Sequence, residues 1–351
     1  MKVGIAGAGI IGQLLAFRLI NEGFQITLFD DNLNRATSRV AAGMLSPITE
    51  LEKCDTIIFQ LGYDALTIHW PHLMAQLDSA IYFKKEGSVV LAHANDVHEL
   101  SRLIRIIQSK LPDHKHYQKL DQSTIHQLEP EIKSFYHGLY VPHEGQVDAQ
   151  AVLLALQNTL IKRATYLPSY VQSVDPYEIK TKDQSYHFDL VCDCRGIGAK
   201  KQFSDLHSIR GELIWVHAPH VTINHPIRLM HPRYRLYIVP RHNHDYLIGS
   251  SEIETSDTSP VSVRTTLELL SAAFSIHSGF GEARIVKMDV GIRPTLPDHL
   301  PKMKYKPGYL AINGCYRNGF LIAPTLLSDV MIYLSKGMQA VRYPTLWEHD
   351  A

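Results

Sequence analysis

The stretch VGIAGAGIIG, residues 3–12, decides how the first part of the chain folds. The apolar residues 2–7 predict a short β-strand, and apolar positions at helical spacing beyond them predict a helix that ends near Gly23. Between the two, Gly7, Gly9 and Gly12 form a G-x-G-x-x-G turn. The first glycine permits a tight turn, the second lets a pyrophosphate approach the backbone, and the third lets helix and strand pack closely. The stretch therefore predicts a turn that holds the phosphates of a dinucleotide at the start of a helix.

The segment FQITLFDD, residues 24–31, adds a second strand and closes a βαβ unit. Asp30 stands at its end, 23 residues after Gly7, where a carboxylate can accept hydrogen bonds from ribose hydroxyls. Asp31 beside it would repel a 2′-phosphate, which argues against NADP. Because strand, turn, helix, second strand and terminal acid occur in register, the dinucleotide prediction is stronger than the glycine motif alone would make it.

Composition and charge narrow the class of partner. The chain has 351 residues, 45% of them hydrophobic, which is enough for a large core in one discontinuous domain or two adjoining domains. Lys plus Arg and Asp plus Glu both number 35, and no long charged run favours nucleic acid or a membrane surface, so a small substrate is expected. The first residues lack signal-peptide features and no apolar run approaches about 18 residues, so we expect a cytoplasmic protein.

Cysteine and histidine placement favours neither a disulfide framework nor a metal site. Cys192 and Cys194 lie two apart in an apolar run, on one face of a strand, which indicates buried thiols rather than a redox pair. The closest histidine pairs lie in polar segments without a third ligand at a recognisable spacing, so no metal is expected. These pairs are His114 with His116 and His242 with His244.

The middle of the chain departs from simple βα alternation. Polar helices, such as residues 95–111, interleave with β-rich runs at 81–92, 210–218, 234–240 and 245–251, and residues 149–163 form another amphipathic helix. The pattern predicts a mixed α/β fold, in which an antiparallel-sheet substrate domain is inserted into a Rossmann-like nucleotide-binding domain. We expect the nucleotide-binding domain to comprise residues 1–80, 146–208 and 290–351, and the substrate domain to comprise residues 81–145 and 209–289.

A second strand, glycine loop and helix occupy residues 308–337. Gly337 ends the predicted helix, and Pro324 is tolerable if it lies in the first turn, where its missing N–H costs little. Its predicted buried face consists of Leu326, Leu327, Val330, Met331 and Leu334. A helix N-terminus of this kind can stabilise the charge that a flavin acquires on reduction. A purely structural capping loop remains the alternative on these residues alone.

Six segments, spread over almost the whole chain, resemble the FAD-dependent D-amino acid oxidase superfamily and, within it, the glycine oxidases of the thiamine-biosynthesis type. They are GAGIIG with Asp30, AAGML at 41–45, RGEL at 210–213, LYIVPR at 236–241, GIRPTLPD at 291–298 and YRNGFLIAP at 316–324. Their order and combination make the resemblance specific, although no single segment is decisive.

This resemblance implies FAD as the cofactor and assigns residues to it. The pyrophosphate would lie along Gly7, Gly9 and Gly12, and the adenosine ribose at Asp30. Further residues implied to lie along the flavin, the adenine or the pyrimidine edge of the ring are Ala41, Ala42, Gly43, Met44, Val174, Gly196, Asn318, Gly319, Phe320 and Leu321. Some related amine oxidases hold flavin through a cysteine in the segment DVGIRPTLPD, but this segment has none here, so we expect non-covalent FAD.

The chemistry of amino acid oxidation indicates the remaining residues. The flavin takes a hydride from Cα, so the protein must mainly anchor the substrate carboxylate, which the planar fork of an arginine does well. Arg293 in GIRP is the predicted anchor, and Arg317 in YRNG a second cation near the substrate or flavin. By resemblance Tyr237 hydrogen-bonds the carboxylate, although a core role would suit a tyrosine on such a strand. Arg235 departs from the family pattern and puts the substrate in doubt.

No catalytic base is required, because the substrate need only lose an ammonium proton to water or a weak acceptor. His231 and Glu252 are candidate relays, and strand ends exposed to solvent explain them equally well.

The sequence thus predicts an FAD enzyme that oxidatively deaminates glycine, and also sarcosine or small D-amino acids, with O2 as electron acceptor. The product imine would supply the thiazole of thiamine, and a homo-oligomer is a further expectation. The alternatives are a D-amino acid dehydrogenase or sarcosine oxidase on the same fold, a non-catalytic NAD-binding module, and a flavin domain acting on RNA nucleosides, which the balanced charge disfavours.

Overall fold

The glycine turn forms where the sequence predicts it. In the computed structural model, which describes residues 1–233 and 236–349, strand β1 (Lys2–Ala6) leads through the turn into helix α1 (Ile10–Asn21), and β2 (Gln25–Phe29) pairs parallel to β1. Gly7 has φ +95°, and a Cβ on Gly12 would lie 1.9 Å from the Gly7 carbonyl oxygen. Helix and strand can approach this closely only because both positions lack a side chain.

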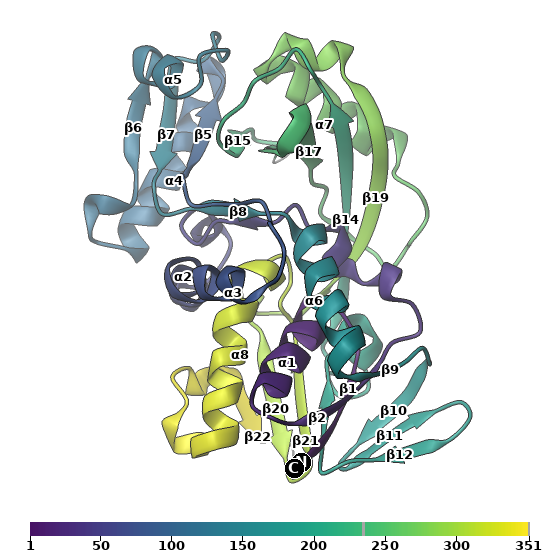
Figure 1. Cartoon of the computed structure of the whole chain (residues 1–351). Helices are drawn as coiled ribbons and strands as arrows, with labels where there is room; N and C mark the ends of the chain where they lie inside the picture. Colours follow the sequence, from purple (N-terminus) through teal and green to yellow (C-terminus); the bar gives the residue numbers. More distant parts are fainter. Residues whose placement is uncertain (234–235, 350–351) are drawn as a thin grey trace.

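The βαβ unit forms the centre of a sheet with seven strands in the described part of the chain (Figure 1). In spatial order the strands are β22 (Trp347–His349), β20 (Lys302–Lys306), β21 (Tyr309–Asn313), β13 (Leu190–Asp193), β1, β2 and β9 (Thr165–Leu167). The five strands from β21 to β9 are parallel, while β20 is antiparallel to β21. Their carboxyl ends therefore meet at one edge, where open α/β sheets bind ligands.

A second, larger sheet forms the other lobe (Figure 1). Its order is β18 (Ile253–Glu254), β14 (His207–His217), β17 (Asp245–Gly249), β16 (Leu236–Pro240), β15 (Ile227–Met230), β5 (Ser88–Ala92), β7 (His137–Val141) and β6 (Gln118–Asp121), and β19 (Arg284–Thr295) also pairs with β14. The sheet is antiparallel as predicted except for one parallel pair, β5 with β15. This pair arises because two separate stretches of chain each contribute an antiparallel block, and the blocks meet edge to edge.

The longest strands of this sheet cross the predicted domain limits. Strand β14 begins at His207, and β19 runs through residue 290 to Thr295, paired with β14 along its length. The exact division of the chain stays a prediction. The continuous pairing carries the end of β19, including Arg293, toward the carboxyl edge of the seven-stranded sheet.

Two small sheets and the helices complete the fold. The small sheets are β3 (Met44–Leu45), β8 (Gly145–Val147) and β4 (Phe83–Lys84), and β10 (Val171–Asp175), β11 (Glu178–Thr181) and β12 (Ser185–His187). The remaining helices are α2 (Thr56–Asp64), α3 (Trp70–Gln76), α4 (Val97–Lys110), α5 (Gln122–Leu128), α6 (Ala149–Arg163), α7 (Val263–Ile276) and α8 (Gly319–Lys336). Helix α1 contacts both α6 and α8 beside the seven-stranded sheet (Figure 1).

Helix α8 differs from its prediction in one respect. It begins at Gly319, so Pro324 lies inside the helix rather than in its first turn, and this expectation was wrong. The early start brings the N-terminus of α8 to the carboxyl edge of the sheet. Among the described residues, α8 is the one helix apolar and long enough by composition to cross a membrane, but ten of its residues are buried inside the protein. Helix α8 therefore packs as a core helix against α1 and α2.

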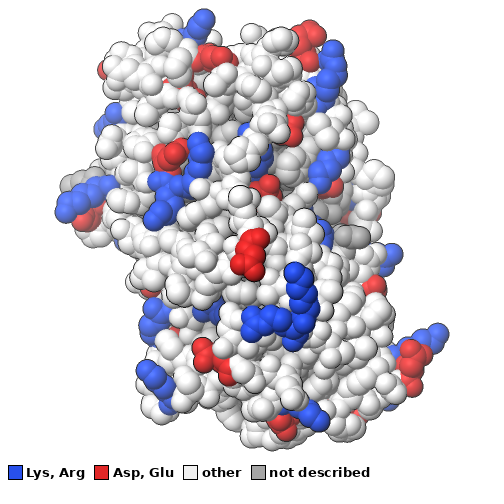
Figure 2. All heavy atoms as spheres, in the orientation of Figure 1, with Lys and Arg blue, Asp and Glu red and all other residues white. Residues whose placement is uncertain are grey.

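The burial of two thiols and the mixture of surface charges agree with what the sequence predicts. Cys192 and Cys194 are both buried and unoxidised in one apolar cluster, which confirms their predicted packing role. Figure 2 shows Lys and Arg interspersed with Asp and Glu across the face in view, without a broad region of one sign.

Candidate active site

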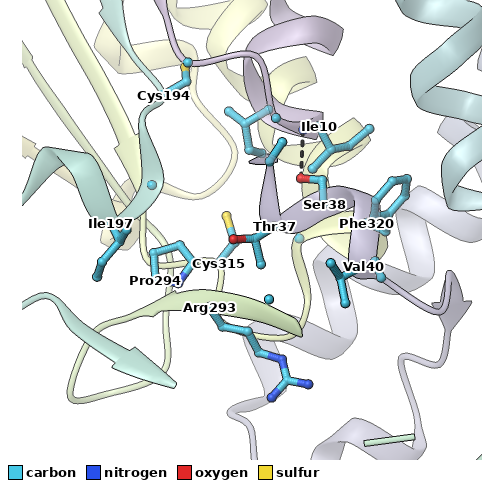
Figure 3. Close-up of a pocket in the computed structure, with 18 of the residues that line it drawn as sticks. Ile10, Thr37, Ser38, Val40, Cys194, Ile197, Arg293, Pro294, Cys315 and Phe320 are labelled. Carbon is cyan, nitrogen blue, oxygen red and sulfur yellow. Dashed lines mark hydrogen bonds between the residues drawn. The ribbon is translucent and has the colours of Figure 1, made fainter. Parts of the chain in front are cut away.

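A cavity of about 450 Å³ runs from the carboxyl edge of the seven-stranded sheet to the end of the larger sheet. Its walls come from the α1 turn, the end of β2, residues 35–46, the loop after β13, strands β14 and β19, and the start of α8 (Figure 3). Of the predicted site residues, those that line it are Gly7, Gly9, Asp30, Ala41, Ala42, Gly43, Met44, Gly196, Tyr237, Arg293, Arg317, Asn318, Gly319, Phe320 and Leu321. Residues that lie far apart in the sequence thus meet around one space.

Two predicted cofactor residues do not line this cavity. Gly12 lies behind the turn, where its role is the close approach to Gly7. Val174 is buried in an apolar cluster, and its carbonyl accepts a hydrogen bond from Gln202 Nε2 at 3.2 Å. Val171, at the start of the same strand β10, lines the cavity instead.

The glycine-turn end of the cavity has a preorganised carboxylate. Asp30 Oδ2 accepts a hydrogen bond from the Ala8 amide at 2.7 Å, and Oδ1 accepts one from the Asn32 amide at 3.0 Å. The Ser38 hydroxyl accepts from the Ile10 amide at 3.0 Å across the start of α1 (Figure 3). These bonds fix Asp30 at the tip of β2 while its remaining lone pairs can accept from hydroxyl groups.

Two helix N-termini face the cavity, and neither is capped by the side chain of the residue that precedes it. Neither Gly9, the residue that precedes α1, nor Asn318, which precedes α8, makes a side-chain cap hydrogen bond. The Asn318 side chain instead donates to Cys54 Sγ at 3.4 Å. The amide groups of a helix start favour anions and developing negative charge. The cavity therefore offers two electropositive places at the carboxyl edge of the sheet.

These features fit FAD. The two helix starts suit a pyrophosphate and an electron-rich ring edge, and Asp30 suits a ribose. Ser46 Oγ lines the cavity as well, is buried, and has no hydrogen-bond partner within the described residues. An extended ligand with polar atoms along its length would satisfy such a group.

Arg293 extends from the end of β19 into the substrate side of the cavity (Figure 3). Its Nη2 donates to Ser250 Oγ at 2.8 Å and its Nη1 to the Ser251 carbonyl at 3.1 Å. Within residues 1–233 and 236–349, no Asp or Glu forms an ion pair with it. Burial lowers the pKa of Arg293 and Arg317 adds to this shift, while Tyr237 and Glu252 oppose it. The site thus holds a half-buried guanidinium whose hydrogen-bond partners are uncharged.

Arg317 lies in the same cavity with a different set of neighbours. Its Nε contacts Glu50 Oε2 at 3.0 Å, and its Nη1 donates to Glu252, which also pairs with Lys53. Burial alone would lower the pKa of Arg317, but Glu50 and Glu252 hold it well above its ordinary value. Of the two predicted cations, Arg293 is therefore the one without an ion pair to a carboxylate in the described structure, although Glu252 acts on it from a greater distance.

Tyr237 has the strand geometry predicted for it. It shares an apolar cluster with Val239 on one face of β16, while Leu236 and Ile238 belong to the core on the other face. Arg235, which the sequence places on the Tyr237 face, lies outside the described residues. The two candidate relays, His231 and Glu252, do not line the cavity.

Several cavity residues were not assigned a role from the sequence. Gly211 in RGEL faces the Arg293 guanidinium, and Glu50 holds Arg317. Gly211 had a signal, because its segment was already singled out, whereas Glu50, in the short helix Thr49–Glu52, had none. Cys315 also lines the cavity as a buried thiol. No group of three or more His, Cys, Asp or Glu in the described ranges is arranged to hold a metal.

Relatives of known class share this architecture. Residues 2–328 match the family model described as FAD dependent oxidoreductase, DAO. The chain is 32% identical over 333 residues to the putative thiamine biosynthesis oxidoreductase ThiO of Rhizobium etli, covering 94% of this chain and 95% of that protein.

Two solved structures share the fold. The glycine oxidase of Geobacillus kaustophilus superposes with a TM-score of 0.85 at 22% identity and covers all of both chains. The iminodiacetate oxidase of Chelativorans sp. BNC1 does so with a TM-score of 0.85 at 20% identity, covering 99% of this chain and all of that one. The match of the family model over most of the chain, and of a relative over nearly its full length, establishes that this chain belongs to the DAO family of FAD-dependent oxidoreductases.

Proposed function

We propose that the enzyme oxidatively deaminates glycine, and also sarcosine or small D-amino acids, to the imine. The observation that carries the proposal is Arg293, a half-buried guanidinium that lines the cavity without an ion-pair partner among the described residues. A partly desolvated cation without an ion pair is costly, so a carboxylate of the substrate is its natural counter-ion.

The protein would hold FAD along the cavity. Gly7 and Gly9 would adjoin the pyrophosphate, Asp30 the ribose, Ala41–Met44 and Gly196 the flavin, and residues 318–321 the pyrimidine edge of the ring. A bound flavin would supply the acceptor for the hydride of the substrate Cα and would pass the electrons on to O2, giving hydrogen peroxide. No cysteine occupies the segment DVGIRPTLPD, so the proposal includes a dissociable cofactor.

The substrate would be held by its carboxylate alone. Arg293 binds the carboxylate, and the Tyr237 hydroxyl, on the same wall of the cavity, donates a second hydrogen bond to it. Ser250 and the Ser251 carbonyl fix the guanidinium, which restricts the orientation of the Cα–H bond. The ammonium proton leaves to water or a weak acceptor before hydride transfer, so no base is assigned.

The names of relatives support this reading. ThiO is named for thiamine biosynthesis, and a structural neighbour is a glycine oxidase. We therefore propose that the imine formed here supplies the thiazole of thiamine. A cytoplasmic location and self-association remain proposals from the sequence.

A peroxide assay of the FAD-loaded enzyme tests the proposal. Glycine should give peroxide, and the rate should fall steeply from glycine to D-alanine to D-leucine as the side chain grows. Glycinamide, which has the amine but no carboxylate, should react at least about a hundredfold more slowly, since it cannot pair with Arg293. Equal rates with glycine and glycinamide would refute carboxylate anchoring, and peroxide only from large amines would refute the substrate class.

A further inference from the structure

The second arginine of the cavity is neutralised by the protein itself. Arg317 has one carboxylate beside Nε, from Glu50, and another at Nη1, from Glu252. A carboxylate binds an arginine most strongly through two parallel bonds from two nitrogens. The partners of Arg317 are both carboxylates, whereas those of Arg293, Ser250 Oγ and the Ser251 carbonyl, carry no charge. Arg317 therefore attracts a substrate carboxylate less strongly than Arg293 does.

The charges near Arg317 also favour a substrate with a single carboxylate. In and around this ion-pair group, the described residues Lys53, Arg293 and Arg317 are cations and Glu50 and Glu252 are carboxylates, so these five side chains together carry one net positive charge. That charge matches one substrate carboxylate at Arg293. A second carboxylate entering beside Arg317 would meet Glu50, whose side chain is 11% exposed and lines the cavity. Charges this close and this poorly solvated repel strongly.

Glu252 is the residue that completes this arrangement. It does not line the cavity but joins Arg317 to Lys53 from the segment between β17 and β18. Burial would raise the pKa of Glu252, but Arg317 and Lys53 hold this pKa well below its ordinary range. The carboxylate therefore stays ionised and paired at every pH at which the enzyme would be studied.

We propose that Glu252 is a specificity-determining residue, which occupies Arg317 and so restricts the enzyme to amines that carry a single carboxylate. The inference rests on the proposed function, because it assumes that Arg293 binds the substrate carboxylate. Removing Glu252 releases Nη1 of Arg317 and raises the net charge of this group by one, so the cavity gains a second cationic place. The variant should then accept dicarboxylic amines in which both arms end in a carboxylate.

Binding of unreactive analogues tests this without relying on turnover. The probes are (methylthio)acetate and thiodiglycolate, which carry sulfur in place of the nitrogen of sarcosine and iminodiacetate and differ by one carboxylate. Each is titrated into the FAD-loaded enzyme while the flavin absorbance is followed. The wild type should bind the monocarboxylate at least about tenfold more tightly than the dicarboxylate. In Glu252→Ala the ratio of the two Kd values should shift by at least about tenfold toward thiodiglycolate.

Two further variants sharpen the result. Glu254→Ala, an exposed glutamate two residues along the chain, removes the same charge from the surface and should leave the ratio unchanged. Glu252→Gln keeps an oxygen for Arg317 but no charge, and should give a shift in the same direction, so an unstable alanine variant would not end the test. The inference is overturned if the wild type binds thiodiglycolate as tightly as (methylthio)acetate, or if both Glu252 variants change the two Kd values equally. Failure of glycine turnover would count against the proposed function alone, since the binding ratio is read separately.

Discussion

The Arg293 guanidinium lies against the backbone of Gly211, so closely that a Cβ on Gly211 would stand 2.1 Å from Nη2 and 2.4 Å from Cζ. Gly211 pairs with Gly291 across β14 and β19, two residues before Arg293. Because Gly211 has no side chain, the Arg293 side chain can pass over it from β19 into the cavity. This close contact explains why the segment RGEL has a glycine where it faces the arginine of the segment GIRP.

Substituting Gly211 with alanine should displace the anchor without removing it. The strand pairing can tolerate alanine, but the flexible guanidinium must move away from Ser250 and Ser251. We expect the KM for glycine to rise by about ten- to a hundredfold, because carboxylate binding depends on the position of both nitrogens. Steady-state kinetics of peroxide formation measure this KM. An unchanged KM in a variant with full FAD content would show that the guanidinium position is not critical.

Two substitutions of Arg293 separate the effect of its positive charge from the effect of its planar guanidinium. Arg293→Lys keeps a cation but loses the planar fork, and Arg293→Ala loses both. We expect kcat/KM for glycine to fall by about 10² in the lysine variant and about 10³ or more in the alanine variant. FAD content, measured from the visible spectrum, should stay near that of the wild type. Near-normal turnover of glycine by Arg293→Ala would eliminate the anchor role.

Asp30 should control cofactor affinity rather than catalysis. Its carboxylate accepts from the Ala8 and Asn32 amides, and its remaining lone pairs suit a ribose. Asp30→Ala should raise the Kd for FAD by about ten- to a hundredfold, as expected for loss of charged hydrogen bonds. At saturating FAD, kcat should be close to the wild-type value. Fluorescence titration of the apoenzyme gives the Kd, and an unchanged value would remove Asp30 from the binding site.

A half-buried histidine, His69, predicts how stability depends on pH. Burial, with help from Arg18 and Arg342, lowers the pKa of His69 to about 4. The unfolded chain therefore takes up a proton near pH 6.5 that the folded chain refuses, so stability is present above this pH and is lost as the pH falls toward 4.

Urea unfolding at pH 7.5 and pH 4.5 measures this effect. The wild type should lose about 2 kcal/mol more of its free energy of unfolding over this interval than His69→Gln does. His126→Gln, which changes an exposed histidine on α5, should behave like the wild type. Identical losses in the wild type and His69→Gln would show that His69 is not the responsible group.

The local parts of the fold could be predicted from the sequence. Short-range patterns determine the strand, turn and helix around Gly7, and both the positive φ of Gly23 and the end of α8 before Gly337 agree with their predictions. Helix α6 (Ala149–Arg163) has the bounds expected for it. Each of these rests on residues within one or two helical turns of one another.

What the sequence could not provide depends on distant residues. The start of α8 at Gly319 places Pro324 inside the helix, and tertiary packing of a buried helix outweighs the lost hydrogen bond. The parallel pairing of β5 with β15 and the contact of Gly211 with Arg293 join segments far apart in the chain. Likewise, Glu50, Glu252 and Arg317 meet only through the fold, so no spacing rule could have shown that Arg317 is neutralised.

Anaerobic reduction of the bound flavin by glycine tests the central claim most directly. The purified, FAD-loaded protein is mixed with glycine in the absence of oxygen and its visible spectrum is followed. The account predicts that the yellow flavin absorbance bleaches and that, when air is admitted, it returns together with hydrogen peroxide. A flavin spectrum that neither glycine nor sarcosine nor D-alanine bleaches would contradict the proposed substrate class, while leaving the family and its cofactor in place.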